Sequence, residues 1–274
     1  MLDLLDINIV DAALYCLTGA FAGFAAGLLG IGGGLIIVPV LFYIFSTQHY
    51  DQQYLMHMAL ATSLATIIIT SISSTLAHHK KNAVLWHTVI LLLPGIGLGS
   101  WFGASFAARL DTATLKPLFG IFEIFVAILM ISQYQSKQHQ RSIKTINGFI
   151  GGGLIGSISA IVGIGGGTLT VPFLHWHRIN IKNAIATSAA CGLPIAIFAT
   201  ASYVFSGWNM SSDAPDSQQN LFGFVQLQAF LLIAASSFLF APLGAKFAHS
   251  ISDVLLKKIF SVFLLLLGLK MLLS

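Results

Sequence analysis

The sequence GLLGIGGGLIIVPVL, residues 27–41, decides how this chain folds, because a second stretch further along repeats it. That stretch, AIVGIGGGTLTVPFL at residues 160–174, matches it at eight of 15 positions, including GIGGG and the proline that follows. An Ala-Thr-Ser triplet comes after each stretch, at 61–63 and at 186–188. A motif that recurs with its neighbour in the same order indicates an internal duplication.

A third and weaker similarity pairs GASFA at 103–107 with GAKFA at 244–248. Because the three similarities follow one order, we predict two homologous halves, an N-terminal repeat at 1–135 and a C-terminal repeat at 145–274. The polar segment 136–144 is predicted to be a cytoplasmic linker between them.

Lipid is the expected solvent of this chain. Apolar residues make up 56% of its 274 residues and charged residues 8%, against about 25% charged in an ordinary soluble domain. The mean hydropathy is +0.87. Long apolar runs, in place of the alternating segments of a membrane barrel, predict an all-α polytopic integral membrane protein. The net charge of +4 comes from basic residues scattered among short loops, which argues against a nucleic-acid partner.

Each half divides into five apolar segments. The stretch 10–46 is too long for a single crossing, because a 37-residue helix is about 55 Å long and the hydrocarbon core is about 30 Å thick. The predicted segments are 10–29, 35–46, 55–77, 84–107 and 113–133 in the first half, and 146–162, 168–177, 183–205, 224–247 and 253–273 in the second.

The basic residues indicate that each glycine-rich stretch turns back toward the side from which it came. With such turns, ten Lys and Arg residues share one side and three the other, whereas straight crossings divide them seven to six. The positive-inside rule favours the turns and places both termini outside. Five segments per half is an odd number, so we predict inverted repeats with broken or re-entrant Gly-rich helices, about 8–10 membrane segments in all.

The glycine-rich turns are candidate anion sites near mid-membrane. A helix that restarts after glycines presents uncovered N–H groups and a partial positive charge. Pro39 and Pro172 are expected to be structural, near the first turns of the restarted helices. The alternative is that the glycines only let helices pack closely. The candidate substrate-binding glycines are Gly30, Gly32, Gly33, Gly34, Gly163, Gly165, Gly166 and Gly167.

The hydroxyl pairs of the two triplets are further candidates for donating to the oxygens of an anion. These are Thr62, Ser63, Thr187 and Ser188. Their alternative role is a hydrogen bond to the preceding helical turn, or helix packing, both common in membrane helices. His57 and Asn183 precede the pairs along the sequence and are weaker candidates.

Glu123 is the only glutamate of the chain and lies inside an apolar run. An ionisable group inside a membrane is costly and is a candidate for proton coupling. By the offset of the third similarity its counterpart is Leu264, so it belongs to no symmetric site. A protonated carboxyl with a structural hydrogen bond is the equally supported alternative.

Other residues do not form a catalytic or metal site. Adjacent His78 and His79 beside two lysines have no Cys or acidic partner and are interpreted as a solvated loop, as are His175 and His177. No catalytic triad, zinc motif or nucleotide-binding motif stands out. We therefore expect no enzyme activity, no metal and no cofactor.

The duplicated GIGGG stretches, each with its Ala-Thr-Ser triplet, resemble the TauE/SafE family of sulfite exporters, also called the four-toluene sulfonate uptake permease family. The resemblance spans both halves. It implies a permease of about eight helices in the bacterial inner membrane that moves sulfite, sulfonates or related small anions. The family serves varied organosulfur and carboxylate compounds, so the resemblance does not fix the substrate.

The sequence thus predicts a secondary transporter that holds a small sulfur-containing anion at its glycine breaks and works by alternating access. The alternative is a membrane scaffold or assembly subunit whose glycines only pack helices. The expected partners are the anion, protons and the lipid bilayer, with a homo-oligomer as an open alternative.

Overall fold

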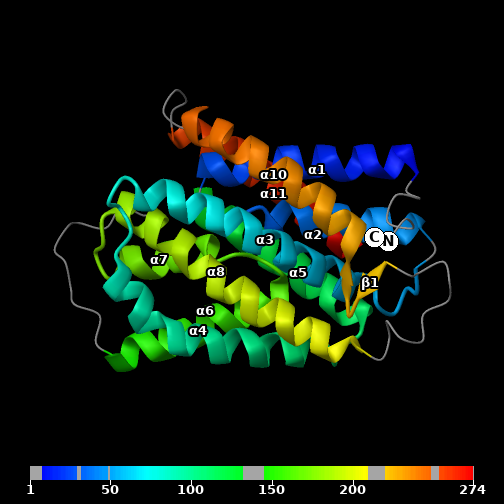
Figure 1. Ribbon diagram of the computed structural model, residues 1–274, viewed down its shortest axis with the longest axis horizontal. Coiled ribbons are helices and arrows are strands. Elements are labelled where there is room, and N and C mark those ends of the chain that lie inside the picture. Colours follow the sequence, from blue (N-terminus) through cyan, green and yellow to red (C-terminus); the bar gives the residue numbers. More distant parts are fainter. Residues whose placement is uncertain are drawn as a thin grey trace.

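The computed structural model describes residues 8–29, 32–48, 50–131, 145–208, 220–247 and 253–273. Gly30 and the predicted linker 136–144 lie outside the described residues. Within the described parts the chain forms ten α-helices and one short antiparallel hairpin, so the all-α prediction is confirmed (Figure 1). The elements are α1 (Ile9–Leu29), α2 (Gly34–Thr47), α3 (Leu55–His79), α4 (Trp86–Ala107), α5 (Thr112–Ile131), α6 (Thr145–Val162), α7 (Gly167–Trp176), α8 (Ile181–Ser206), β1 (Leu221–Phe222), β2 (Val225–Gln226), α10 (Leu227–Phe247) and α11 (Asp253–Leu273).

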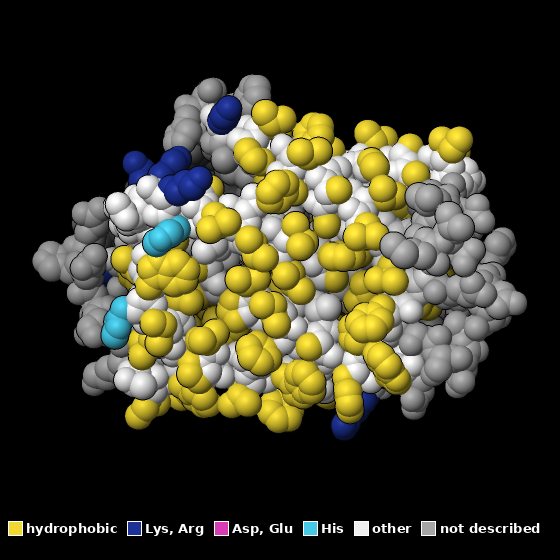
Figure 2. Space-filling view, in the orientation of Figure 1, with side chains coloured by type: hydrophobic (Ala, Val, Ile, Leu, Met, Phe, Trp, Pro, Cys, Tyr) yellow, Lys and Arg dark blue, Asp and Glu magenta, His cyan; other side chains and the backbone are white. Residues whose placement is uncertain are grey.

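The outer surface of the helices is apolar, as a lipid solvent requires. Seven of the helices are long and apolar enough to cross a membrane. Large side chains such as Phe102 and Leu266 are 64% and 62% exposed, and Figure 2 shows apolar side chains over most of the visible face. A surface of this kind would aggregate in water. The chain is a multi-pass membrane protein.

The two short helices turn back along the helices that precede them. The Tyr15 hydroxyl, early in α1, donates to Gln48 Oε1 just after α2, over 3.0 Å. Gly151, in the first half of α6, lies against the ring of Phe173 near the end of α7. Both glycine-rich stretches are therefore turns, which is the alternative that the charge distribution favoured.

Helices from different halves pack against each other through small residues. On the two flanks α4 packs on α6 and α1 on α10, while α3 packs on α8 in the middle and α5 packs on α11 (Figure 1). A Cβ at Gly99 of α4 would overlap the carbonyl oxygen of Gly153 in α6, and a Cβ at Gly23 would lie 2.5 Å from the carbonyl oxygen of Ser237. Such close backbone approach is how membrane helices associate without a hydrophobic driving force.

Two helices begin later than the sequence predicts. The apolar segments expected from residues 84 and 224 become helical only at Trp86 and Leu227. Before them, Asn82 and Gly223 adopt positive φ angles of 52° and 59°, a left-handed conformation that interrupts a right-handed helix. The residues between, 83–85 and 224–226, are therefore not helical.

Candidate functional site

The two glycine-rich turns contact each other. A Cβ placed on Gly32 would lie 3.5 Å from the Cα of Gly165, and one on Gly34 would lie 2.6 Å from the carbonyl oxygen of Gly163. A Cβ on Gly34 would therefore overlap the opposite turn, and the φ angles of +70° at Gly32 and Gly163 favour glycine at those positions. The two duplicated motifs therefore touch, backbone against backbone.

Both short helices start at this contact, each without a side-chain cap. Gly33 and Gly166 occupy the N-cap positions of α2 and α7, and neither end has a side-chain hydrogen bond. The first amides of a helix have no acceptor within it and carry a partial positive charge. The arrangement offers two sets of backbone donors to one small anion.

The two prolines lie one turn deeper than the sequence suggested. Pro39 and Pro172 are each the sixth residue of their helix, in its second turn. Neither can donate the hydrogen bond to the carbonyl four residues earlier, so each weakens its helix beside the glycine break. A weakened second turn leaves the first turn easier to reorient.

The serines of the two triplets differ in their hydrogen bonds. The Ser63 hydroxyl donates to the carbonyl oxygen of Gly163 over 2.9 Å and so joins α3 to the opposite glycine turn. The Ser188 hydroxyl donates to the Ile185 carbonyl over 2.8 Å, within its own helix. Ser63 therefore lies at the glycine contact, whereas Ser188 has the local bond of the alternative interpretation.

The threonines of the triplets accept hydrogen bonds from the other half of the chain. Thr62 Oγ1 accepts from the backbone N–H of Gln226, and Thr187 Oγ1 accepts from that of Leu85, each over 3.0 Å. Asn183 Nδ2 also donates to the Ala83 carbonyl, over 2.9 Å. A hydroxyl that accepts one bond can still donate its own hydrogen, so these contacts are compatible with the predicted role in binding an anion.

The β1–β2 hairpin, 221–226, was not anticipated from the sequence as a functional element. Its Phe224 ring is buried and lies 5.1 Å, centroid to centroid, from the ring of His57, with Tyr54 and Tyr203 around it. The sequence did contain a signal for this element. The offset that aligns GASFA with GAKFA also pairs Val84 with Val225, so the two segments before these helices correspond to each other.

His57 is held in one orientation beneath this hairpin. Its Nε2–H donates to the Leu110 carbonyl oxygen over 2.8 Å, because a carbonyl can only accept. Its Nδ1 is buried and has no partner among the described residues. Tyr50 lies in the loop before α3, where burial raises the pKa of its phenol. The phenol therefore stays protonated, and its oxygen accepts a hydrogen bond from Gln226 Nε2.

Glu123 is fully buried where α5 packs on α11. Its Cβ lies close to Gly268, where an added Cβ would approach within 3.3 Å. Neither carboxyl oxygen has a hydrogen-bond partner among the described residues. Within the described residues, Glu123 therefore lacks the structural hydrogen bond that was the alternative explanation for a neutral carboxyl.

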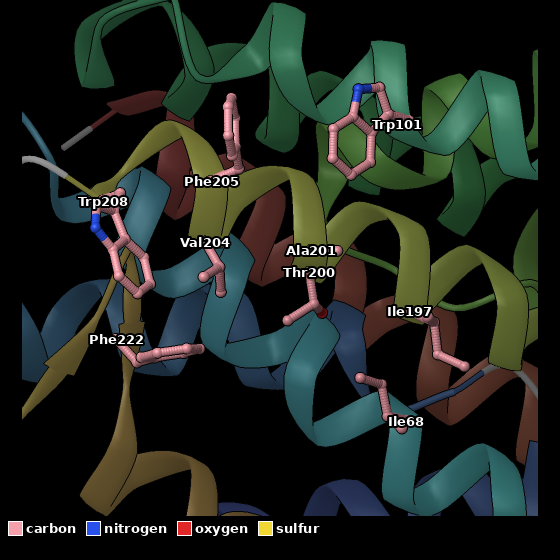
Figure 3. Close-up of a pocket in the computed structure, with 9 residues that line it drawn as sticks. All are labelled: Ile68, Trp101, Ile197, Thr200, Ala201, Val204, Phe205, Trp208 and Phe222. Carbon is pink, nitrogen blue, oxygen red and sulfur yellow. The ribbon is translucent and has the colours of Figure 1, made fainter.

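An apolar groove of about 490 Å³ opens beside the hairpin, between α3, α4 and α8 (Figure 3). Trp208 points toward Phe222, with ring centroids 5.6 Å apart, and Thr200 is the polar residue of the lining. Such walls suit a lipid chain better than an oxyanion. The groove is therefore distinct from the glycine contact.

Basic side chains gather at the end of the molecule opposite the hairpin, where α3 and α7 end (Figure 2). The predicted solvated loops lie there, and the indole N–H of Trp86 donates to His79 Nδ1 over 3.2 Å. In the described ranges no three His, Cys, Asp or Glu side chains are grouped as a metal site. At the hairpin end, Lys270 lies 4.1 Å from the centroid of the Tyr43 ring.

Comparison with known proteins extends over nearly the whole chain. The family described as Sulfite exporter TauE/SafE matches residues 15–271. A probable membrane transporter protein of Haemophilus influenzae is 40% identical over 95% of this chain and 98% of its own length. Another probable membrane transporter protein, from Methanocaldococcus jannaschii, is 30% identical over 95% of each chain. No solved structure matches.

Proposed function

Because the chain belongs to the TauE/SafE family and is a membrane transporter, we propose that it carries small sulfur-containing oxyanions, such as sulfite or an organosulfonate, across a bacterial inner membrane. The observation that carries this proposal is the meeting of two uncapped helix N-termini at Gly33 and Gly166. The family and the named relatives are transporters and not enzymes.

The chemistry of the contact suits a compact oxyanion. Around the glycine turns lie backbone amides, the Ser63 hydroxyl and aliphatic side chains such as Ile67 and Leu60. Amide dipoles in a low-dielectric site attract an anion without the bidentate grip of an arginine. An anion bound in this way can also leave, as transport requires.

The two halves are proposed to work as inverted repeats that rock around the glycine contact. The pairing of α1 with α10 and of α6 with α4 supports this proposal, because α1 corresponds to α6 and α10 to α4, so the two pairs are equivalent to each other. The basic end, with Lys80, Lys81, Arg178 and Lys182, is assigned to the cytoplasm by the positive-inside rule. Both termini then face outward.

Glu123 is proposed as the proton-coupling residue. A buried carboxyl without a described partner is stable only in its neutral form, and it can release its proton when water reaches it. The helices packed against α5 are α11, α3 and α6; the described titratable groups of the first two include Lys258, Lys270 and His57, and α6 has none. None of their described hydrogen bonds reaches Glu123.

The substitution Gly165→Ala tests the anion site with little effect on folding. A Cβ there would lie 3.3 Å from the Cγ2 methyl of Ile67 and 3.8 Å from the Cα of Gly32, so the backbone is clear of it and only the Ile67 side chain has to shift slightly. The new methyl group would cover the amides between the turns. We expect labelled sulfite or sulfonate flux into proteoliposomes to fall about tenfold, the effect of one misplaced methyl group in a tight site.

The matched control is Gly153→Ala, a glycine of α6 whose Cβ would lie 3.8 Å from the nearest atom, the carbonyl oxygen of Gly95. This variant is expected to transport like the parent protein. Equal flux in both variants would contradict the glycine site. Absence of flux from the parent protein with every sulfur oxyanion, sulfonate and carboxylate tried would favour the scaffold alternative.

A further inference from the structure

Two non-helical segments, the hairpin 221–226 and the segment 80–85, occupy equivalent places before α10 and α4 and share a left-handed residue. The offset that aligns GASFA with GAKFA pairs Asn82 with Gly223, and these two residues share the left-handed conformation, with φ angles of 52° and 59°. It also pairs Val84 with Val225, both buried. The hairpin lies at the start of α3 and the segment 80–85 follows its end.

Each segment is fixed by a threonine from the other half. Gln226, immediately before α10, donates its backbone N–H to Thr62 in α3, and Leu85, immediately before α4, donates its own to Thr187 in α8. The two bonds have the same length, 3.0 Å, and involve equivalent atoms. Since both threonines are fully buried, breaking either bond leaves a buried amide without its partner.

The triplets connect these segments to the glycine contact. Ser63, next to Thr62, donates to Gly163, and Ser188, next to Thr187, has a carbonyl oxygen that a Cβ on Gly166 would approach within 2.8 Å. Each of the two triplets therefore contacts both a glycine turn and one of the two segments. A movement of the turn can reach the segment through a single helical turn of α3 or α8.

We propose that the hairpin 221–226 and the segment 80–85 are the two gates of the path to the glycine contact, each latched by the triplet threonine of the opposite half. This proposal rests on the proposed transport function. Opening the latch at Thr62 exposes the contact to one face of the membrane, and opening the latch at Thr187 exposes it to the other.

The two gates differ in the side chains that hold them closed. The hairpin places the aromatic ring of Phe224 against His57, whereas its counterpart in the other segment is Ala83, held through its carbonyl by Asn183. In addition to its threonine bond, the hairpin gate is thus held by ring packing, and the other gate by a second hydrogen bond. Removing the ring of Phe224 should open the first gate without disturbing the second.

Thiol labelling from each face tests the gates without a substrate. The two native cysteines are first removed by Cys16→Ser and Cys191→Ala. The reporter Ser188→Cys then measures access to the glycine contact in the latch variant Thr62→Val. The reporter Ser63→Cys measures it in the latch variant Thr187→Val. The probe is a small anionic methanethiosulfonate, applied to right-side-out or inside-out vesicles. Loss of one hydrogen bond should raise the labelling rate about tenfold, from opposite faces for the two variants.

The controls share the helices but lie outside the latches. Thr66, which donates to the Thr62 carbonyl, is changed to valine in α3, and Thr200 is changed to valine in α8. Neither should raise labelling. If Thr62→Val fails to fold, Phe224→Ala tests the same gate, with increased labelling expected from the same single face.

Faster labelling from one common face, or unchanged rates in folded variants, would overturn the two-gate proposal. The result is separable from the transport assay. Labelling from opposite faces without flux of any anion would keep the gates and reject the substrate class. Flux with unchanged labelling would keep the transporter and place its path elsewhere.

Discussion

Replacing Gly99 by alanine is expected to destabilise the folded protein by about 3 kcal/mol, through overlap with the backbone of a neighbouring helix. A Cβ at this position in α4 would overlap the carbonyl oxygen of Gly153 in α6. Because the obstacle is backbone, no side-chain rotation relieves it, and the two helices must move apart. We expect a lower thermal midpoint in detergent and loss of the monodisperse species.

The same change on the opposite side of this contact should have little effect. At Gly153 an added Cβ has 3.8 Å of clearance from the nearest atom, so Gly153→Ala keeps the α4–α6 contact intact. The pair of variants separates backbone overlap from the general effect of adding a methyl group to a membrane helix. Similar thermal midpoints for the two would show that α4 and α6 do not pack as described.

The second large effect is expected at Glu123, where Glu123→Gln should abolish accumulation driven by an imposed pH gradient. Glutamine has nearly the same shape but cannot take up or release a proton. One-for-one exchange of labelled for unlabelled anion needs no net proton movement and should persist. Comparing gradient-driven uptake with exchange in the same proteoliposomes measures the two activities separately.

Two variants control for structural effects at this position. Glu123→Asp keeps the ionisable group and should retain part of the gradient-driven uptake. Ser261→Ala removes a buried hydroxyl from α11, the helix that packs on α5, and should leave coupling unchanged. If Glu123→Gln accumulates the anion like the parent protein, the carboxyl has a structural role and the proton is carried elsewhere.

The sequence was sufficient to predict the helices and the turns between them. The length of an apolar segment determines whether it can cross the membrane as a helix. Most of the expected segments therefore agree with the observed helices within a few residues. The turns at the glycine stretches followed from the count of basic residues, a property of the whole chain. Both signals reflect the cost of placing charge and exposed backbone in lipid.

The contacts between the halves could not be predicted in this way. Apolar periodicity does not say that Gly99 faces Gly153, because in lipid every face of a helix is apolar. Nor did the Ala-Thr-Ser pattern show that Thr62 accepts a backbone bond, since a hydroxyl can donate or accept. Phe224 was missed because it resembles the other lipid-facing phenylalanines until the hairpin places it beside His57.

The exchange of partners between the halves also sets the order in which the protein can be completed during synthesis. The glycine face of α1 fits α10, which follows about two hundred residues later, and α4 fits α6 beyond the linker. Contacts so distant along the chain form late. Until the second half is inserted, the faces of α1 and α4, like those of α3 and α5, have no partner helix in the bilayer, so the first half is not a finished unit on its own.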